Sequence, residues 1–135
     1  MNGWRWNNFD ASEVLSPEGL MMLLKGVMLI SPKLLDTLEE FRTYIQAPII
    51  INTDKLKYRG YRSPHENYGI VGGERYSFHM QGLAADCSST IEVDRLHDLA
   101  LSFGKWHGIG FYPTKGFVHL DIRPNLDNSI TRWSA

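Results

Sequence analysis

The sequence predicts an α+β fold in which a small antiparallel sheet packs against N-terminal helices. Serine–proline pairs and helical spacing of apolar residues indicate helices in the first half of the chain. Short β-branched and aromatic segments indicate strands, most of them toward its end. Helices followed by strands, without regular βα alternation, are typical of this fold class.

Helices are expected to begin at the serine–proline pairs of residues 16–17 and 31–32, with serine as N-cap and proline in the first turn. After the second pair, apolar residues recur at helical spacing: Leu34, Leu38, Phe41 and Ile45. Pro48 ends this helix. A third helix is expected over residues 93–103, with Gly104 as its C-terminal stop.

Strands are expected at residues 48–53, 82–89, 108–112 and 117–122. The segment PTKG joins the last two strands, which therefore form a hairpin. Between the first two strands, residues 54–76 are rich in Gly, Arg, Tyr and Asn and show no clear period. A long irregular stretch inside a compact domain is often a binding or active-site loop.

The bulk composition narrows the class of protein. The chain has 135 residues, which suits one domain over residues 1–135. Its formal net charge is -1, so it lacks the electropositive surplus of most nucleic-acid binders, and no nucleic-acid partner is expected. Cys87 is the single cysteine, which excludes an internal disulfide.

Targeting signals are not evident in the sequence. The N-terminus, MNGWRWNNFDASEV, lacks the basic start and apolar run of a secretory signal. The longest apolar stretch, GLMMLLKGVMLI, is interrupted by Lys25 and is shorter than the ~20 residues that span a bilayer. We therefore expect no membrane insertion, and we expect the protein to be cytoplasmic as synthesised.

Strand alternation places the polar side chains of two predicted strands on one side of the sheet. In the last strand, one face has Val118, Leu120 and Ile122, and the other has Phe117, His119 and Asp121. In the strand over residues 82–89, Leu83, Ala85 and Cys87 face one side, while Ala84 and Asp86 face the other. If both strands belong to one sheet, Asp86 and His119 can share a face, and His79 lies in the turn before the first of them.

His79, Asp86 and His119 are therefore a candidate metal site. Imidazole nitrogen and carboxylate oxygen both bind zinc, and three protein ligands leave a fourth position for water. Such a metal lowers the pKa of its water toward ~7. On spacing alone, a hydrogen-bonded histidine and a turn carboxylate explain these residues equally well, and Asp121 can simply pair with Arg123.

Other polar and aromatic residues have two interpretations each. Arg62 is either a surface arginine or a clamp for a substrate carboxylate. Ser77 either caps a turn or orients a substrate amine. Tyr112 and Trp106 either belong to the core or form a cleft wall. The remaining histidines, His65, His97 and His107, are expected at solvated or hydrogen-bonded positions.

Three motifs in order give a more specific signal. SxHxxGxAxD stands at residues 77–86, GYRSPxxN with a following glycine pair at residues 60–73, and GIGxYPxxxFVHxDxR at residues 108–123, with Trp133 beyond it. Together they resemble the zinc peptidases of bacterial cell walls, which include D-Ala-D-Ala carboxypeptidases and phage L-alanyl-D-glutamate endopeptidases. The fold of this family is shared with the hedgehog signalling domain. The resemblance extends from about residue 31 to the end of the chain.

The resemblance implies a zinc-dependent peptidase that cleaves stem peptides of bacterial peptidoglycan, as a D,D-carboxypeptidase or an endopeptidase such as a phage endolysin. It implies that His79, Asp86 and His119 bind Zn²⁺ and that Arg62 and Ser77 contact the substrate. Without a signal peptide, such an enzyme reaches the wall after release or by another export route.

One departure from the family pattern concerns the general base. Many relatives have an acidic residue three positions before the last histidine ligand, where this chain has Gly116. Asp121 points to the same side as His119, so we expect it either to be the base or to orient an imidazole ligand. In the first case Arg62 helps to stabilise the oxyanion. The departure at Gly116 also favours an alternative, a non-catalytic zinc-binding module with a binding or structural role, for example in a phage virion.

A second departure is the segment TDKLKYRGYR, which looks longer than the usual link between the strand and the GYRSP motif. It is expected to reshape the substrate cleft.

Overall fold

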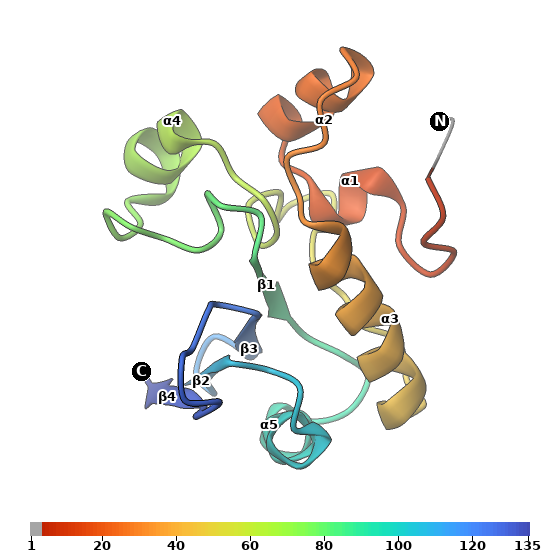
Figure 1. The fold of residues 1–135 in the computed structure, drawn as a ribbon, viewed down its shortest axis with the longest axis vertical. Coiled ribbons are helices and arrows are strands. Elements are labelled where there is room, and N and C mark those ends of the chain that lie inside the picture. The colour runs from red at the N-terminus through yellow and green to blue at the C-terminus, as the bar shows by residue number, and fades with distance from the viewer. Residues whose placement is uncertain (1–3) are drawn as a thin grey trace.

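The computed structural model describes residues 4–135 (Figure 1). The helices are α1 (Ala11–Val14), α2 (Pro17–Leu24), α3 (Pro32–Ile45), α4 (Pro64–Glu66), the π-helical turn η1 (Asn67–Val71) and α5 (Val93–Phe103). The strands are β1 (Ala84–Cys87), β2 (Gly108–Tyr112), β3 (Phe117–Asp121) and β4 (Thr131–Ser134). Residues 1–3 lie outside the described residues. They belong to the predicted domain and to the N-terminal segment in which no secretory signal is expected.

The four strands form one sheet in the order β1-β3-β2-β4. Strand β3 pairs antiparallel with both β1 and β2, which confirms the predicted hairpin. Helix α5 packs on β2 and β3, and α3 packs on α5, so these helices cover one face of the sheet (Figure 1). The predicted α+β fold is confirmed. The sequence did not predict β4, which pairs parallel with β2 and exposes three of its four residues.

Both serine–proline pairs begin helices as predicted. The Ser16 hydroxyl accepts a hydrogen bond from the Gly19 N–H (3.2 Å), whereas Ser31 occupies the N-cap position of α3 without a side-chain bond. The predicted apolar face of α3 is buried: Leu34, Leu38, Phe41 and Ile45. Helix α3 ends where Gln46 adopts the left-handed conformation, and α5 ends in the same way at Gly104.

The predicted strand over residues 48–53 is wrong. Ile50 forms only an isolated antiparallel bridge with Ser88. Beyond it, the Asn52 amide group donates to the Ser12 and Leu15 carbonyls, and this side chain holds the segment against α1 as a connection. A short apolar run indicates burial, but it does not distinguish a strand from a buried connection.

The prediction of an irregular stretch over residues 54–76 is also partly wrong, because α4 and η1 lie within it. Ser63-Pro64 is a third serine–proline helix start, and it forms a capping box. The Ser63 hydroxyl accepts from the Glu66 N–H, and the Glu66 carboxylate accepts from the Ser63 N–H. The buried Glu66 carboxylate also accepts from the Ser16 hydroxyl at 2.5 Å, which ties α4 to the start of α2.

The buried side chains form one hydrophobic cluster that extends from Trp6 to Ile122. That residues 1–135 form one domain stays a prediction. Trp106 is fully buried in this cluster, where its ring packs edge-on against Phe41, so it is a core residue and not a cleft wall. Within residues 4–135, no helix combines the length and the apolar composition needed to cross a membrane.

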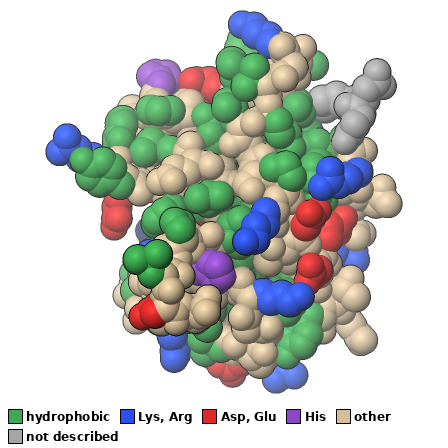
Figure 2. Space-filling model, viewed as in Figure 1, with side chains coloured by type: hydrophobic (Ala, Val, Ile, Leu, Met, Phe, Trp, Pro, Cys, Tyr) green, Lys and Arg blue, Asp and Glu red, His purple; other side chains and the backbone are tan. Residues whose placement is uncertain are grey.

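The surface over α3 mixes charges of both signs (Figure 2). Arg5 pairs with Asp36 on this face at 3.6 Å, and Lys105 pairs with Glu40. The neighbouring opposite charges offset one another, so this part of the face does not form a patch of one sign.

Candidate metal centre

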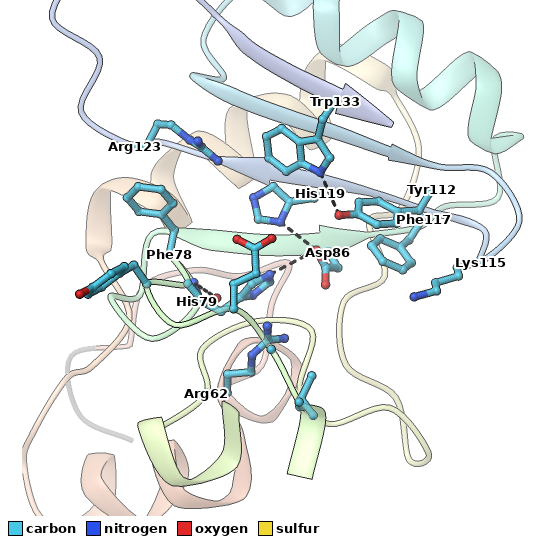
Figure 3. Close-up of a pocket in the computed structure, with 16 residues that line it drawn as sticks. Arg62, Phe78, His79, Asp86, Tyr112, Lys115, Phe117, His119, Arg123 and Trp133 are labelled. Atoms are coloured by element: carbon cyan, nitrogen blue, oxygen red, sulfur yellow. Dashed lines mark hydrogen bonds and ion pairs between the residues drawn. The ribbon is translucent and has the colours of Figure 1, made fainter. Parts of the chain in front are cut away.

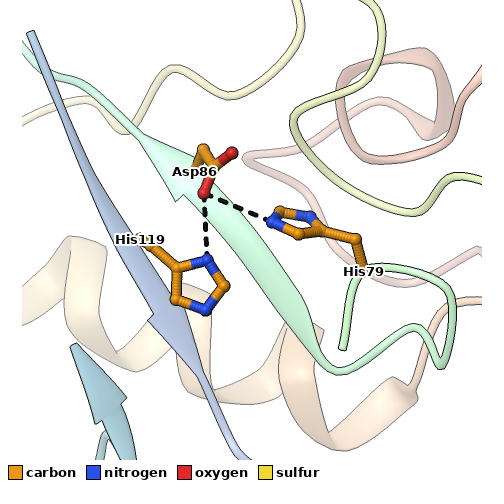
Figure 4. Close-up of side chains that lie close together, drawn as sticks. All are labelled: His79, Asp86 and His119. Atoms are coloured by element: carbon orange, nitrogen blue, oxygen red, sulfur yellow. Dashed lines mark hydrogen bonds and ion pairs between the residues drawn. The ribbon is translucent and has the colours of Figure 1, made fainter. Parts of the chain in front are cut away.

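Three polar side chains meet on the face of the sheet opposite the helical core (Figure 4). The antiparallel register places Asp86 of β1 directly opposite His119 of β3. His79 approaches from the turn that precedes β1. One imidazole nitrogen or carboxylate oxygen from each residue lies within 4.8 Å of the other two. Asp86 and His119, which strand alternation placed on one face, and His79 from the preceding turn are therefore neighbours in space.

Asp86 lies between the two imidazole rings. Its Oδ1 atom is 3.3 Å from His79 Nε2 and 3.1 Å from His119 Nδ1. The other His79 nitrogen, Nδ1, lies 2.9 Å from the Gly60 carbonyl oxygen. A carbonyl can only accept, so Nδ1 bears the proton and the lone pair of Nε2 faces Asp86. The backbone of the GYRSP segment thus fixes the tautomer of His79.

His119 is oriented in a similar way from the opposite side. Its Nε2 atom lies 2.7 Å from Asp121 Oδ2, so Nδ1 is the nitrogen that faces Asp86. Asp121 has no exposed surface, and its two oxygens also accept from the Arg123 guanidinium at 2.7–3.1 Å. A carboxylate that holds the distal nitrogen of an imidazole is a common outer partner of metal-binding histidines.

The electrostatics of this cluster favour bound positive charge. Burial alone would raise the pKa of Asp86, but His79 and His119 outweigh it and hold the pKa of this carboxyl below its ordinary value. Burial alone would lower the pKa of His119, but its hydrogen bonds to Asp121 and Asp86 raise that pKa to about 9. Protons and a metal cation compete for the same lone pairs at such a site.

The donor set fits a zinc ion. Two imidazole nitrogens and one carboxylate oxygen are ligand types that zinc prefers, and three protein donors are typical of catalytic rather than structural zinc. The nitrogens that face the cluster are already selected by Gly60 and Asp121. His79 and His119 are also largely buried, at 4% and 8% exposure, which limits competition from bulk water.

Two glycines of β2 make room for the site. Gly108 pairs with Asp121, and Gly110 pairs with His119 on one side and with Trp133 on the other. A Cβ atom at Gly108 would lie 2.3 Å from an oxygen of Asp121, and one at Gly110 would lie 2.5 Å from the Trp133 ring. The GIG sequence therefore places a glycine at each of the two positions where the side chain of a neighbouring strand, Asp121 or Trp133, lies directly over β2.

A cleft of about 480 Å³ opens onto the cluster (Figure 3). The predicted substrate-contacting residues Arg62 and Ser77 line it, and Tyr112 lines it in one of its two predicted roles, as a cleft wall. The cleft is also lined by residues for which no cleft position was predicted: Phe78, Lys115, Phe117, Arg123 and Trp133. Glu74 lines it as well, from the irregular stretch of residues 54–76 that was expected to be a binding or active-site loop. Glu74 follows directly after the glycine pair of the second motif, and this position within the predicted loop is the local signal that could have singled it out.

Arg62 is a buried arginine that borders the cleft, at 8% exposure. Its Nε atom donates to Asn67 Oδ1 at 2.8 Å, and its Nη1 atom donates to the Tyr58 carbonyl at 3.0 Å. Nη2 has no hydrogen-bond partner among the described residues. A Cβ at Gly73 would lie 2.9 Å from Nη2, so the glycine pair leaves this nitrogen uncovered.

The positions of Ser77 and of the remaining histidines agree with what was expected from the sequence. Ser77 Oγ accepts from the His79 N–H (3.2 Å), so it caps the turn and also lines the cleft. Outside the cleft, the remaining histidines are engaged with neighbours: His65 with Glu18, His97 with Phe111 and Asp98, and His107 with the Arg123 carbonyl.

An α+β fold with an imidazole–carboxylate–imidazole cluster at a cleft is typical of a metal-dependent hydrolase. A family model described as Peptidase M15 matches residues 9–121, a range that includes all three clustered side chains. The match covers most of the chain, so the chain belongs to the peptidase M15 family and is a zinc metallopeptidase. The resemblance seen in the sequence is thereby confirmed. Comparisons with curated proteins and with solved structures returned no match.

Replacing Gly108 with alanine should lower the free energy of unfolding by about 1–3 kcal/mol, because the sheet must move to accommodate the new Cβ. Gly69→Ala is the matched control, since the nearest atom to its Cβ would be 3.8 Å away, and we expect a change below about 1 kcal/mol there. Urea unfolding of both variants measures the difference. A Gly108→Ala protein as stable as the parent would contradict the close approach of Asp121 to β2.

Proposed function

We propose that this peptidase hydrolyses stem peptides of bacterial peptidoglycan, with zinc held by His79 Nε2, Asp86 and His119 Nδ1. The observation that supports this substrate class is the Nη2 atom of Arg62, which lies at the cleft without a hydrogen-bond partner among the described residues. Stem peptides have free carboxylates close to their scissile bonds, and a guanidinium with an uncovered N–H suits such a group. The three sequence motifs, which resemble those of cell-wall peptidases, support the same proposal.

The residues around the cleft have different roles in peptide hydrolysis. When bound, zinc would polarise the scissile carbonyl and lower the pKa of the attacking water. Asp121 holds the ring of His119 so that Nδ1 faces the site. Arg62 positions a substrate carboxylate, while the Ser77 hydroxyl and Tyr112 contact the peptide. As a D,D-carboxypeptidase or an endopeptidase, for example an endolysin, the protein would act on the wall after leaving the cell that makes it.

The contacts of Asp121 support one of the two roles expected for it from the sequence. Its carboxylate has no exposed surface and is engaged by His119 and Arg123. A general base must reach the attacking water, so this geometry supports the orienting role of Asp121 over the role of base. Gly116, where relatives have an acidic residue, lies exposed in the β2–β3 turn with φ 78°, a conformation that suits glycine.

Glu74 is our candidate for the general base. Among the described residues that line the cleft, Asp86 and Glu74 are the carboxylates, and Asp86 belongs to the metal cluster. Asn67 anchors the loop that holds Glu74. Its side-chain amide donates to the Glu74 backbone carbonyl at 2.8 Å, and its own backbone carbonyl accepts from the Gly73 N–H. A base supplied by this loop also weakens the alternative of a non-catalytic module, which was based on Gly116.

The substrate proposal is tested by incubating the zinc-loaded protein with purified muropeptides and analysing the products by mass spectrometry. We expect one peptide bond of the stem to be hydrolysed, and we expect a chelator or the His119→Ala substitution to stop the reaction. The fragment masses then identify the bond. Intact muropeptides after prolonged incubation with fully loaded protein would contradict the proposal.

The roles of Asp121 and Glu74 are separated by two amide substitutions assayed at saturating zinc. Asp121→Asn should weaken zinc binding by about 10–100-fold, as loss of an outer partner does, while turnover largely recovers at saturating zinc. Glu74→Gln should leave zinc affinity unchanged and lower kcat by about 10²–10⁴-fold, the usual contribution of a general base. Glu92→Gln, on the exposed surface at the start of α5, is the control. The reverse pattern would make Asp121 the base.

A further inference from the structure

Tyr112 and Trp133 form a hydrogen-bonded aromatic pair in the wall of the cleft (Figure 3). The Trp133 indole N–H donates to the Tyr112 hydroxyl oxygen at 2.8 Å. The Tyr112 ring stacks on Phe117 with centroids 4.6 Å apart, and the indole lies 5.0 Å from the ring of His119. These contacts fix the hydroxyl group beside the metal cluster.

The direction of this hydrogen bond leaves the tyrosine proton available. An indole nitrogen can only donate, so the Tyr112 oxygen must be the acceptor. The hydroxyl proton of Tyr112 has no acceptor among the described residues. A hydroxyl that accepts one hydrogen bond becomes a stronger donor of its own, because the two bonds polarise each other. The pair therefore presents a polarised O–H donor to the cleft.

The sheet is built to accommodate this pair. Trp133 belongs to β4, which pairs in parallel with β2 and sets Trp133 beside Gly110. On its other side, Gly110 pairs with His119 of β3. A side chain at position 110 would occupy the space of the indole, since a Cβ there would lie 2.5 Å from the ring. Packing alone would be satisfied by phenylalanine at position 112, whereas the hydroxyl and the indole N–H are matched to each other.

We infer that Tyr112 is a catalytic residue that donates a hydrogen bond to the oxyanion formed from the scissile carbonyl, and that Trp133 is its positioning residue. As water attacks the carbonyl carbon, the C=O π electrons move to the carbonyl oxygen. The Tyr112 O–H binds this developing charge and keeps its proton. This inference rests on the proposed function, because it requires a peptide carbonyl in this cleft.

The test compares the affinity of the full-length, zinc-loaded protein for a tetrahedral mimic with its affinity for zinc. The probe is a phosphinate analogue of the bond that the muropeptide digest identifies, and calorimetry measures its binding. Tyr112→Phe retains the stacking on Phe117, so the fold should be kept. Tyr44→Phe is the control, because Tyr44 is exposed on α3 and bonds to Ser102 outside the cleft.

We expect Tyr112→Phe to weaken the phosphinate and to lower kcat by about 10²–10³-fold, the loss seen when one oxyanion donor is removed, with KM and zinc affinity little changed. Trp133→Phe, which removes the indole N–H together with part of the aromatic surface beside His119 and Arg123, should have a smaller effect in the same direction. Tyr44→Phe should match the parent protein in every measurement.

Three outcomes would overturn the inference. If Tyr112→Phe binds the phosphinate as tightly as the parent protein does, the hydroxyl does not stabilise the oxyanion. If zinc affinity or thermal stability falls together with phosphinate affinity, the role of Tyr112 is structural. If the parent protein neither cleaves muropeptides nor binds the phosphinate, the proposed function itself fails, and the role of Tyr112 fails with it.

Discussion

The antiparallel pairing of β1 with β3 brings Asp86 and His119 together, and the rest of the site depends on this register. The same pairing sets Ala85 against Leu120 on the opposite, fully buried face. A shift by one residue would turn the polar pair into the apolar core and the apolar pair out to the cleft. Hydrophobic burial on one face therefore enforces the geometry that chemistry needs on the other.

A line of hydrogen-bonded charges connects this strand pair to Arg123 at the edge of the cleft. Arg123 holds Asp121, Asp121 holds His119 through Nε2, and His119 presents Nδ1 to Asp86. Burying such charges is costly unless each has a partner, and here each one does. This arrangement explains why Asp121, although close to the metal cluster along the strand, is better suited to orient an imidazole than to accept a proton from water.

Much of this fold was predictable because its signals are local. Serine–proline pairs, helical spacing and strand alternation located α2, α3, α5 and the three antiparallel strands, and alternation also grouped Asp86 with His119. The parallel strand β4 was not predictable, because its residues are mostly exposed and its pairing joins distant segments. Glu74 was not singled out within its predicted loop, because hydrogen bonds with Asn67 and not a local pattern set the path of that loop.

The tautomers of the two clustered histidines test the account most directly. Nitrogen-15 NMR of the zinc-loaded protein reports which nitrogen of each ring bears a proton and which binds the metal. We predict that His79 binds through Nε2 with its proton on Nδ1, and that His119 binds through Nδ1 with its proton on Nε2. The other three histidines should not respond to zinc. Binding of His119 through Nε2 would contradict the role assigned to Asp121.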